Sequence, residues 1–556
     1  MDWIAARRAA WLAAAFGVTA WPAVASRDAT WRAPEAPAED CLVPVGAQAA
    51  AAAPPPPVLL DGLGFAGIEP DSANAEARAW FAQGVRLIWA FDEVEAIRAF
   101  QMAQRLDPNC AMCQLGEAWA RGPTINLSPR TPELAAARAA VARAAGLAGR
   151  LGARDRLILR GMEIRTRPGA DFSNEAYATY MEGAALLMPG DDTLAIMAAD
   201  ARMVAWGETK PPPGSLAQQL LERVLARSPN HGGAIHYYIH LTDWIDRQEL
   251  AVPYAERLGG IAPAASHLVH MPSHSFFGVG RYRDAAAVNV AAIAADRAFV
   301  LRARPAASDY RVGLLAHNMH FAIESALARG DGGTALAVSG QFRQTYLTGE
   351  VDGRVRVLGA ATFYARGLHD DVAAVLAIPD PANVFDRAQR HYARGEALAR
   401  RGDAAAVRAE AAAIAALRAG RDSPGLGRRG DQLAEVFQYV LEGRAAMLAG
   451  DPGLAAAAYR KAMERQLASD FGGDPPLFWY SVRRSLGAAM LASGDHLSAR
   501  AQLYVSLRSW PNDALALYLL SLADRAAGDI ATADRNLARA RALWAGEVTE
   551  VPLSRI

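Results

Sequence analysis

The stretch from residue 80 to residue 108, WFAQGVRLIWAFDEVEAIRAFQMAQRLDP, decides the fold. Large and small residues alternate along it at fixed spacing, and a proline closes it: Trp80, Gly84, Ala96, Phe100, Ala103 and Pro108. Two antiparallel helices pack closely only where small residues lie at their crossing, and a proline ends the second helix before the next unit begins. The stretch therefore predicts a pair of packed helices that forms one unit of a repeat.

The same spacing recurs near the C-terminus. Gly494 and Gly528 are 34 residues apart, and so are Ala499 and Ala533, while a further copy covers residues 443–462. A 34-residue period with these residue types is the pattern of tetratricopeptide (TPR) repeats. Frequent glycine and proline leave no room for a sheet. We therefore expect an all-α protein built as a TPR-type α-α superhelix, or solenoid.

The first 25 residues have the three parts of an export signal. Arg7 and Arg8 are followed by an apolar run over residues 9–21 and by Ala23-Val24-Ala25, a small-residue cleavage pattern. We expect cleavage after Ala25, with an uncleaved N-terminal anchor as the alternative. The Ala- and Pro-rich residues 26–59 then form a tether, and the mature protein is periplasmic or secreted, with no membrane insertion after cleavage.

Composition narrows the class of protein further. Lys plus Arg is 58 and Asp plus Glu is 58, so the formal net charge is zero and no basic arm for nucleic acid is expected. The 3 Cys exclude a disulfide scaffold and a zinc-finger array. After the tether we expect N-terminal TPR-like repeats over 60–230, His-rich central repeats over 231–345 and C-terminal repeats over 346–556. The oligomeric state is open.

The histidines are concentrated in the central repeats. Seven of the 11 lie between His236 and His320, where an even distribution would place fewer than two. In the repeat register, His236 and His270 occupy position 5, and His240 and His274 occupy position 9. These positions lie on one helix face, and in TPR arrays that face lines the concave groove.

Other potential ligands share this face. His267 and His317 fall at position 2, and His320 with Glu324 repeats the 5-and-9 pair one unit later. Equal positions on neighbouring helices lie about 8–10 Å apart between helix axes, so their side chains converge. The predicted metal ligands are His236, His240, Asp243, His267, His270, His274, His317, His320 and Glu324.

Imidazole-rich sets bind Zn, Cu or Fe, so we expect one or two transition-metal ions. Whether the metal supports turnover is open. Two alternatives also stay open: a metal-free groove that binds a peptide or small molecule, and histidines that only pack. Pro272 lies between His270 and His274, so it either weakens this i,i+4 pair or bends the helix to aim His274.

Cys110 and Cys113 form a CxxC motif after the first repeat. No His follows at position 114, so attachment of c-type haem is excluded. Three interpretations stay open: a local disulfide, a pair of metal ligands and two buried thiols.

Several segments together resemble a family of bacterial TPR proteins, which is distantly similar to tetratricopeptide repeat protein 38 of animals. They are residues 107–113 (DPNCAMC), 236–240 (HYYIH), 267–274 (HLVHMPSH), 317–321 (HNMHF) and 475–480 (PPLFWY). The resemblance covers residues from about 60 to about 546. It implies an all-α TPR superhelix and brings no settled activity. The residues that match its motifs are the histidines already named, with Cys110 and Cys113.

Overall fold

The computed structural model describes residues 54–126, 131–169, 171–207, 209–306, 308–347, 352–420, 427–469 and 475–556. All of these residues belong to one compact unit, Ala38–Ile556. They form α-helices, short 3-10 turns and loops, with no strand among them. The predicted all-α TPR solenoid is confirmed. The predicted signal peptide and most of the predicted tether lie outside the described residues.

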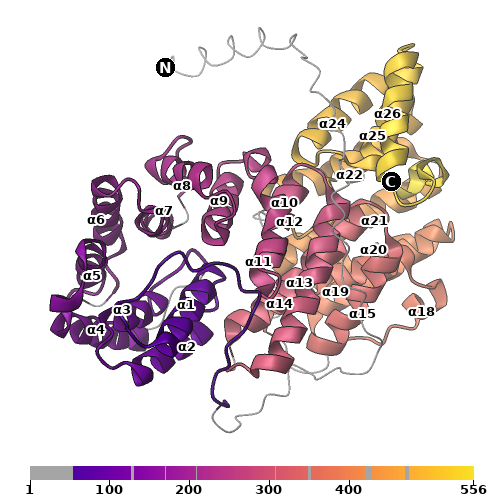
Figure 1. Ribbon diagram of the computed structural model, residues 1–556. Helices are drawn as coiled ribbons and strands as arrows, with labels where there is room; N and C mark the ends of the chain where they lie inside the picture. The colour runs from indigo at the N-terminus through magenta and orange to yellow at the C-terminus, as the bar shows by residue number, and fades with distance from the viewer. Residues whose placement is uncertain are drawn as a thin grey trace, which may run out of the picture. The chain divides into compact units, whose positions relative to one another are not determined.

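Consecutive helices pack against one another in pairs along the chain (Figure 1). The first repeats contain α1 (Ala75–Trp89), α2 (Glu93–Leu106), α3 (Ala111–Ala120), α4 (Thr131–Gly146), α5 (Ala153–Arg165), α6 (Asn174–Leu187), α7 (Asp192–Trp206) and α8 (Leu216–Arg227). The central repeats contain α9 (Gly232–Trp244), α10 (Val252–Ile261), α11 (Ser266–His270), α12 (Pro272–Gly278), α13 (Tyr282–Ala303), α14 (Asp309–Ala328) and α15 (Gly332–Tyr346).

The last repeats contain α16 (Gly353–Leu358), α17 (Ala360–His369), α18 (Val372–Leu376), α19 (Val384–Arg400), α20 (Ala404–Ala419), α21 (Gly427–Leu448), α22 (Pro452–Ala468), α23 (Arg483–Ala492), α24 (His496–Ser509), α25 (Ala514–Ala526) and α26 (Ile530–Leu543). The 3-10 turns are η2 (Ala148–Arg150), η3 (Gln248–Leu250), η4 (Val548–Glu550) and η5 (Leu553–Arg555). None of the helices in the described ranges is both long enough and apolar enough to cross a membrane.

A Gly-Asp turn joins the two helices of many pairs. Gly494 and Gly528 have φ values of 82° and 84°, which a residue without a Cβ adopts without strain. The following Asp495 and Asp529 each accept a hydrogen bond from a backbone N–H three residues later, at 3.1 Å. This capping satisfies one of the free N–H groups at the start of the second helix. The same Gly-Asp turn thus recurs with the 34-residue period of the sequence.

Small residues face large ones within the pairs, as the repeat pattern predicts. A Cβ placed on the glycine would come within 2.3–3.0 Å of the ring or side chain opposite in three separate pairs: Gly84 with Phe100, Gly443 with Tyr459, and Gly487 with Leu503. In all three the large residue follows the glycine by the same interval. Close helix packing therefore depends on the absence of a side chain at these glycines.

We expect Gly84→Ala to destabilise the protein by about 1–3 kcal/mol through overpacking. Its new Cβ would lie 2.7 Å from Cε1 of Phe100, and this cost exceeds the gain of up to about 1 kcal/mol that Ala brings to a helix. Gly183→Ala in α6 is the matched control, because no atom lies within 4 Å of its new Cβ, and it should stabilise. Urea unfolding measures both, and equal gains would contradict the packing argument.

An extended segment before α1 runs along the helices. The Gln83 side chain accepts from the backbone N–H of Leu60 and donates to the carbonyl of Val58. The indole N–H of Trp89 donates to the carbonyl of Ala66 at 3.0 Å. These bonds hold the segment by its backbone and fix the indole of Trp89, the last residue of α1.

Candidate metal centre

Six of the nine predicted ligands gather into two groups of three. The ligand atoms of each group lie within 4.8 Å of one another. The first triad is His236 and His240 of α9 with His267 of α11. The second triad is His270 of α11 and His274 of α12 with His317 of α14.

The two triads are built by the same rule. Each takes two histidines four residues apart, from α9 or from the consecutive α11 and α12, and a third from position 2 of the next repeat unit along the chain. His267 and His270 are neighbours on α11, so this one short helix contributes to both triads. A single helix face, repeated with the period of the solenoid, therefore produces two equivalent ligand sets.

In the first triad, one imidazole nitrogen faces two others. The Nδ1 atom of His236 lies 2.6 Å from the carbonyl oxygen of Trp89, so it carries the proton and donates it. Its Nε2 atom therefore has no proton and carries a lone pair. This atom lies 3.1 Å from Nε2 of His240 and 2.9 Å from Nε2 of His267. One lone pair does not satisfy two N–H donors well, whereas a metal ion at the centre engages all three nitrogens.

These separations agree with a shared ion. Zn–N bonds are about 2.0–2.1 Å, so two nitrogens on one tetrahedral ion lie about 3.3 Å apart. The observed 2.9 and 3.1 Å are only a few tenths of an ångström shorter.

The second triad has the same arrangement. The amide nitrogen of Asn289 donates to the carbonyl of Ala285 at 2.8 Å, so its Oδ1 faces Nδ1 of His270 at 2.7 Å and accepts the proton there. The Nε2 atom of His270 therefore carries a lone pair, and it lies 2.9 Å from Nε2 of His274. Hydrogen bonds that orient the far nitrogen of a ligating imidazole are typical of metal sites.

Pro272 lies between the two histidines, at the first position of α12, where no N–H is needed. The backbone at Met271, between α11 and α12, keeps helical angles, with φ −50° and ψ −37°. The Nε2 atoms of His270 and His274 lie 2.9 Å apart, so the i,i+4 pair is kept despite the proline.

Five of the six imidazoles, those of His236, His240, His267, His270 and His317, are neutral at pH 7. Burial lowers the pKa of His236 to about 3, and the pKa values of His240, His267, His270 and His317 are also well below the ordinary value, again mainly because of burial. The other imidazoles of the cluster lower them further, because neighbouring positive charges repel. Neutral imidazole is the form that binds a metal, so the ligands need not lose protons first.

Aromatic rings enclose the cluster on both sides. The ring of Phe91 lies 4.4 Å from that of His236 and 5.3 Å from that of His267. Phe91 has a φ of 56°, a strained conformation for a bulky residue. On the other side Phe321 lies 5.2–5.6 Å from all three rings of the second triad.

The triads adjoin one another and reach solvent along one side. His240 lies 5.8 Å from His274, and His267 lies 5.9 Å from His270, between ring centroids, which matches the spacing within each triad. His236 and His270 are fully buried, whereas His240 and His274 are 7% and 8% exposed, and His317 is half-buried. A ligand from solvent therefore approaches on the side of these three histidines.

The other three predicted ligands lie outside the triads. The Asp243 carboxylate accepts a hydrogen bond from the side-chain amide of Gln248 at 2.9 Å. It also lies 3.7 Å from Nδ1 of His274, on the opposite side of that ring from Nε2. His320 and Glu324 are buried and face each other at 3.6 Å. The groove helix that follows them, α16–α17, offers only His369 as a ligand type, and this ring packs against Gly332.

Sequence patterns missed the residues that orient the ligands. Trp89 contributes only a backbone carbonyl, from the end of α1, 147 residues before His236. Asn289 lies on α13, the second helix of its pair, and therefore outside the groove register. Neither belongs to a recognisable motif. The motif spacing that located the histidines gives no signal for them.

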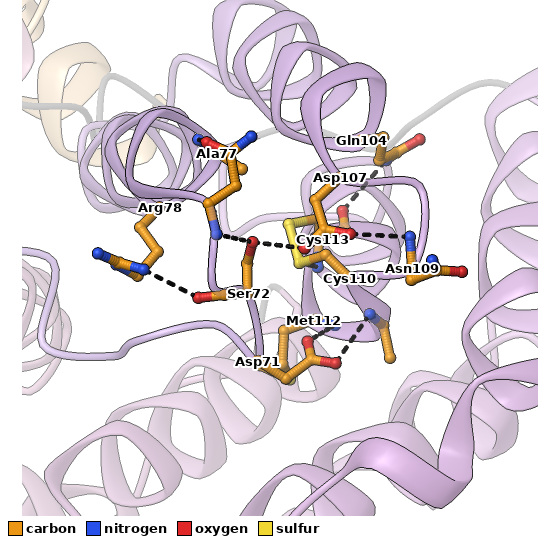
Figure 2. The surroundings of a disulfide bond; sticks show 12 residues. Asp71, Ser72, Ala77, Arg78, Gln104, Asp107, Asn109, Cys110, Met112 and Cys113 are labelled. Atoms are coloured by element: carbon orange, nitrogen blue, oxygen red, sulfur yellow. Dashed lines mark hydrogen bonds between the residues drawn. A yellow bond between two sulfur atoms is a disulfide. The ribbon is translucent and has the colours of Figure 1, made fainter.

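The CxxC motif is a disulfide, which decides among its three interpretations. The Cys110–Cys113 bond is fully buried at the start of α3, where Sγ of Cys110 accepts from the N–H of Cys113. Asp71 accepts from the backbone N–H groups of Ala111 and Met112, which lie between the two cysteines, and Figure 2 shows it beside the disulfide. The bond is structural in position and contributes no ligand to the triads.

No protein-family model matches this chain, and no curated protein matches it. Similar solved structures include the APC/C hetero-tetramer Cut9-Hcn1, with a TM-score of 0.31, 14% identity, and coverage of 71% of this chain and 79% of that one. A human IFIT1 dimer with m7Gppp-AAAA has a TM-score of 0.29 and 12% identity, with coverage of 85% of this chain and 91% of that one. The P58(IPK) TPR domain has a TM-score of 0.23 and 11% identity, with coverage of 82% of this chain and 99% of that one. These are TPR-repeat structures, and at such scores they carry no argument about function.

Proposed function

We propose that this chain is a metalloprotein that binds two transition-metal ions, one in each histidine triad. The observation that supports this most directly is the single lone pair of His236, which faces two imidazole nitrogens at 2.9 and 3.1 Å. The same orientation by Nδ1 recurs at His270. Six imidazole nitrogen donors suit Cu, Zn or Fe and do not suit Mg or Ca, which prefer oxygen.

Three imidazoles leave at least one coordination position open on each ion. In catalytic zinc sites such a position holds a water whose pKa the ion lowers to about 7, which supplies a nucleophile. In this chain the partly exposed histidines lie where that position meets solvent, while Phe91 and Phe321 keep the opposite sides apolar. This arrangement supports a small reactant, water or oxygen, and hence a metal-dependent enzyme.

We also propose that the protein is exported, to the periplasm or the cell exterior. The export signal of residues 1–25 directs the chain out of the cytoplasm. The buried Cys110–Cys113 disulfide supports this, because disulfides persist in oxidising compartments. The motifs similar to bacterial TPR proteins and to tetratricopeptide repeat protein 38 assign no activity to the site.

Elemental analysis of untagged mature protein tests the proposal. We expect about two transition-metal ions per chain, either as purified or after dialysis against Zn, Cu or Fe and removal of excess metal. Protein that retains none of these metals would overturn the proposal and leave the TPR groove as a metal-free surface for a peptide or protein partner. A stoichiometry of one would overturn the assignment of an ion to each triad.

A further inference from the structure

A second cavity lies among the later repeats and shares no residue with the histidine triads. It has a volume of about 180 Å³ and is lined from α15, α16, α17, α19 and the loop between α18 and α19. Drug-sized ligands occupy sites of about 300 Å³ or more, so this cavity suits a compact molecule. Its lining contains three arginines and one carboxylate: Arg343, Arg356, Arg366 and Asp386.

Two of the arginines already have counter-charges. Arg356 forms a close ion pair with Asp386. The Nε atom of Arg366 lies 2.9 Å from a carboxylate oxygen of Asp370, and its Nη2 donates to the carbonyl of Ala374 at 3.3 Å. Neither pair uses every N–H of its guanidinium, which has five, so donors are left for a ligand.

Arg343 has no such partner. Its side chain makes no ion pair and no hydrogen bond with any residue in the described part of the chain. Partial burial lowers the pKa of Arg343, the nearby charge of Arg366 lowers it further, and the carboxylate of Asp370 opposes this shift. Two like charges held beside a cavity favour an anion between them. A carboxylate also matches the planar geometry of a guanidinium.

The remaining wall of the cavity is mostly apolar. Thr362 and four apolar residues complete the lining: Leu347, Phe363, Ile378 and Pro381. The loop that carries Ile378 and Pro381 is held from α19, where Arg390 donates to the carbonyl of Ile378 at 2.8 Å and Arg387 donates to that of Pro381 at 2.9 Å. A ligand in the cavity thus meets both cationic donors and a fixed apolar surface.

We propose that this cavity binds a small organic carboxylate, with its head group on Arg343 and Arg366 and its apolar part against Phe363 and Ile378. The proposal is independent of metal binding. It gives the chain a second ligand site, on helices that contribute nothing to the triads.

Isothermal titration of the full mature chain with benzoate tests the site. We expect saturable binding that weakens about 10- to 100-fold in Arg343→Gln, as for the loss of a charge-assisted hydrogen bond. Arg354→Gln is the matched control, because it removes the same charge from an exposed residue outside the cavity, and it should keep binding within about twofold. Far-UV circular dichroism checks that both variants fold.

Two further probes separate the parts of the proposal. Benzamide has the shape of benzoate without its charge and should bind at least tenfold more weakly. Inorganic phosphate has the charge without the apolar part and should also bind more weakly. Absence of saturable benzoate binding, equal loss in both arginine variants, or phosphate binding tighter than benzoate would each overturn the proposal.

Discussion

Replacing His236 by Ala should remove one metal ion from the protein and leave the other, and His270→Ala should do the same for the second triad. Each of these histidines is the imidazole whose Nδ1 is fixed by a hydrogen bond, to Trp89 or to Asn289. Its loss leaves two ligands, too few to retain a tightly bound ion. The metal content measured by elemental analysis should therefore fall from about two ions per chain to about one in each single variant, and to none in the double variant.

His320→Ala is the matched control for these losses. His320 is a buried histidine of the same central repeats, 2% exposed, and it lies outside both triads. We expect the variant to retain both ions. Loss of an ion from this variant would contradict the two-triad assignment and would restore His320 to the ligand set predicted from its register.

A subtler variant tests whether the orientation of the ring matters. Asn289→Ala removes the acceptor for Nδ1 of His270 and leaves all six imidazoles in place. Loss of such an outer partner typically weakens metal binding about 10- to 100-fold. The effect should be confined to the ion of the second triad, so a chelator titration should resolve one weakened and one unchanged site.

The period of the sequence located the triads because the solenoid copies one helix face from repeat to repeat. His236 and His270 occupy equal positions 34 residues apart, and each fills the equivalent place in its own triad. The same logic placed His320 and Glu324 in the set, but a triad also needs a third ligand from the following groove helix. That helix, α16–α17, has no ligand at the required place.

The features of the site that the sequence could not predict depend on contacts between residues distant in sequence. The carbonyl of Trp89 is a backbone group that no side-chain motif can show, and it reaches His236 only because the end of α1 packs against α9. Phe91 reaches the triad through a backbone conformation with positive φ, which sequence disfavours for an aromatic residue. Such positions follow from tertiary packing, and a single sequence contains no periodic signal for them.

Glu324→Gln should make the metal-free protein increasingly more stable than wild type as the pH rises. The Glu324 side chain is fully buried, and neither of its carboxylate oxygens has a hydrogen-bond partner among the described residues. Nε2 of His320 lies 3.6 Å from Oε1 of Glu324, too far for a hydrogen bond. Burial therefore raises the pKa of Glu324 well above its ordinary value of 4.5.

The direction of the effect follows from proton counting. Above pH 4.5 the unfolded chain releases this proton, whereas the folded chain keeps it until the pH reaches the raised pKa. In that window the folded state binds one more proton, so its stability falls with rising pH, by about 1.4 kcal/mol per pH unit for one group. Gln does not titrate, so the free energy of unfolding of the variant relative to wild type should rise by this amount per unit.

Urea unfolding at several pH values between 5 and 8 measures this slope in chelator-treated protein. The comparison of two chains that share every histidine cancels the titration of the imidazoles, and the slope is independent of any constant cost of burying an amide. Glu464→Gln, on an exposed position of α22, is the matched control for the loss of a carboxyl group. A relative stability that stays flat with pH would show that Glu324 is ionised in the folded protein. In that case its charge must have a partner, and a cation beside His320 is the first to test.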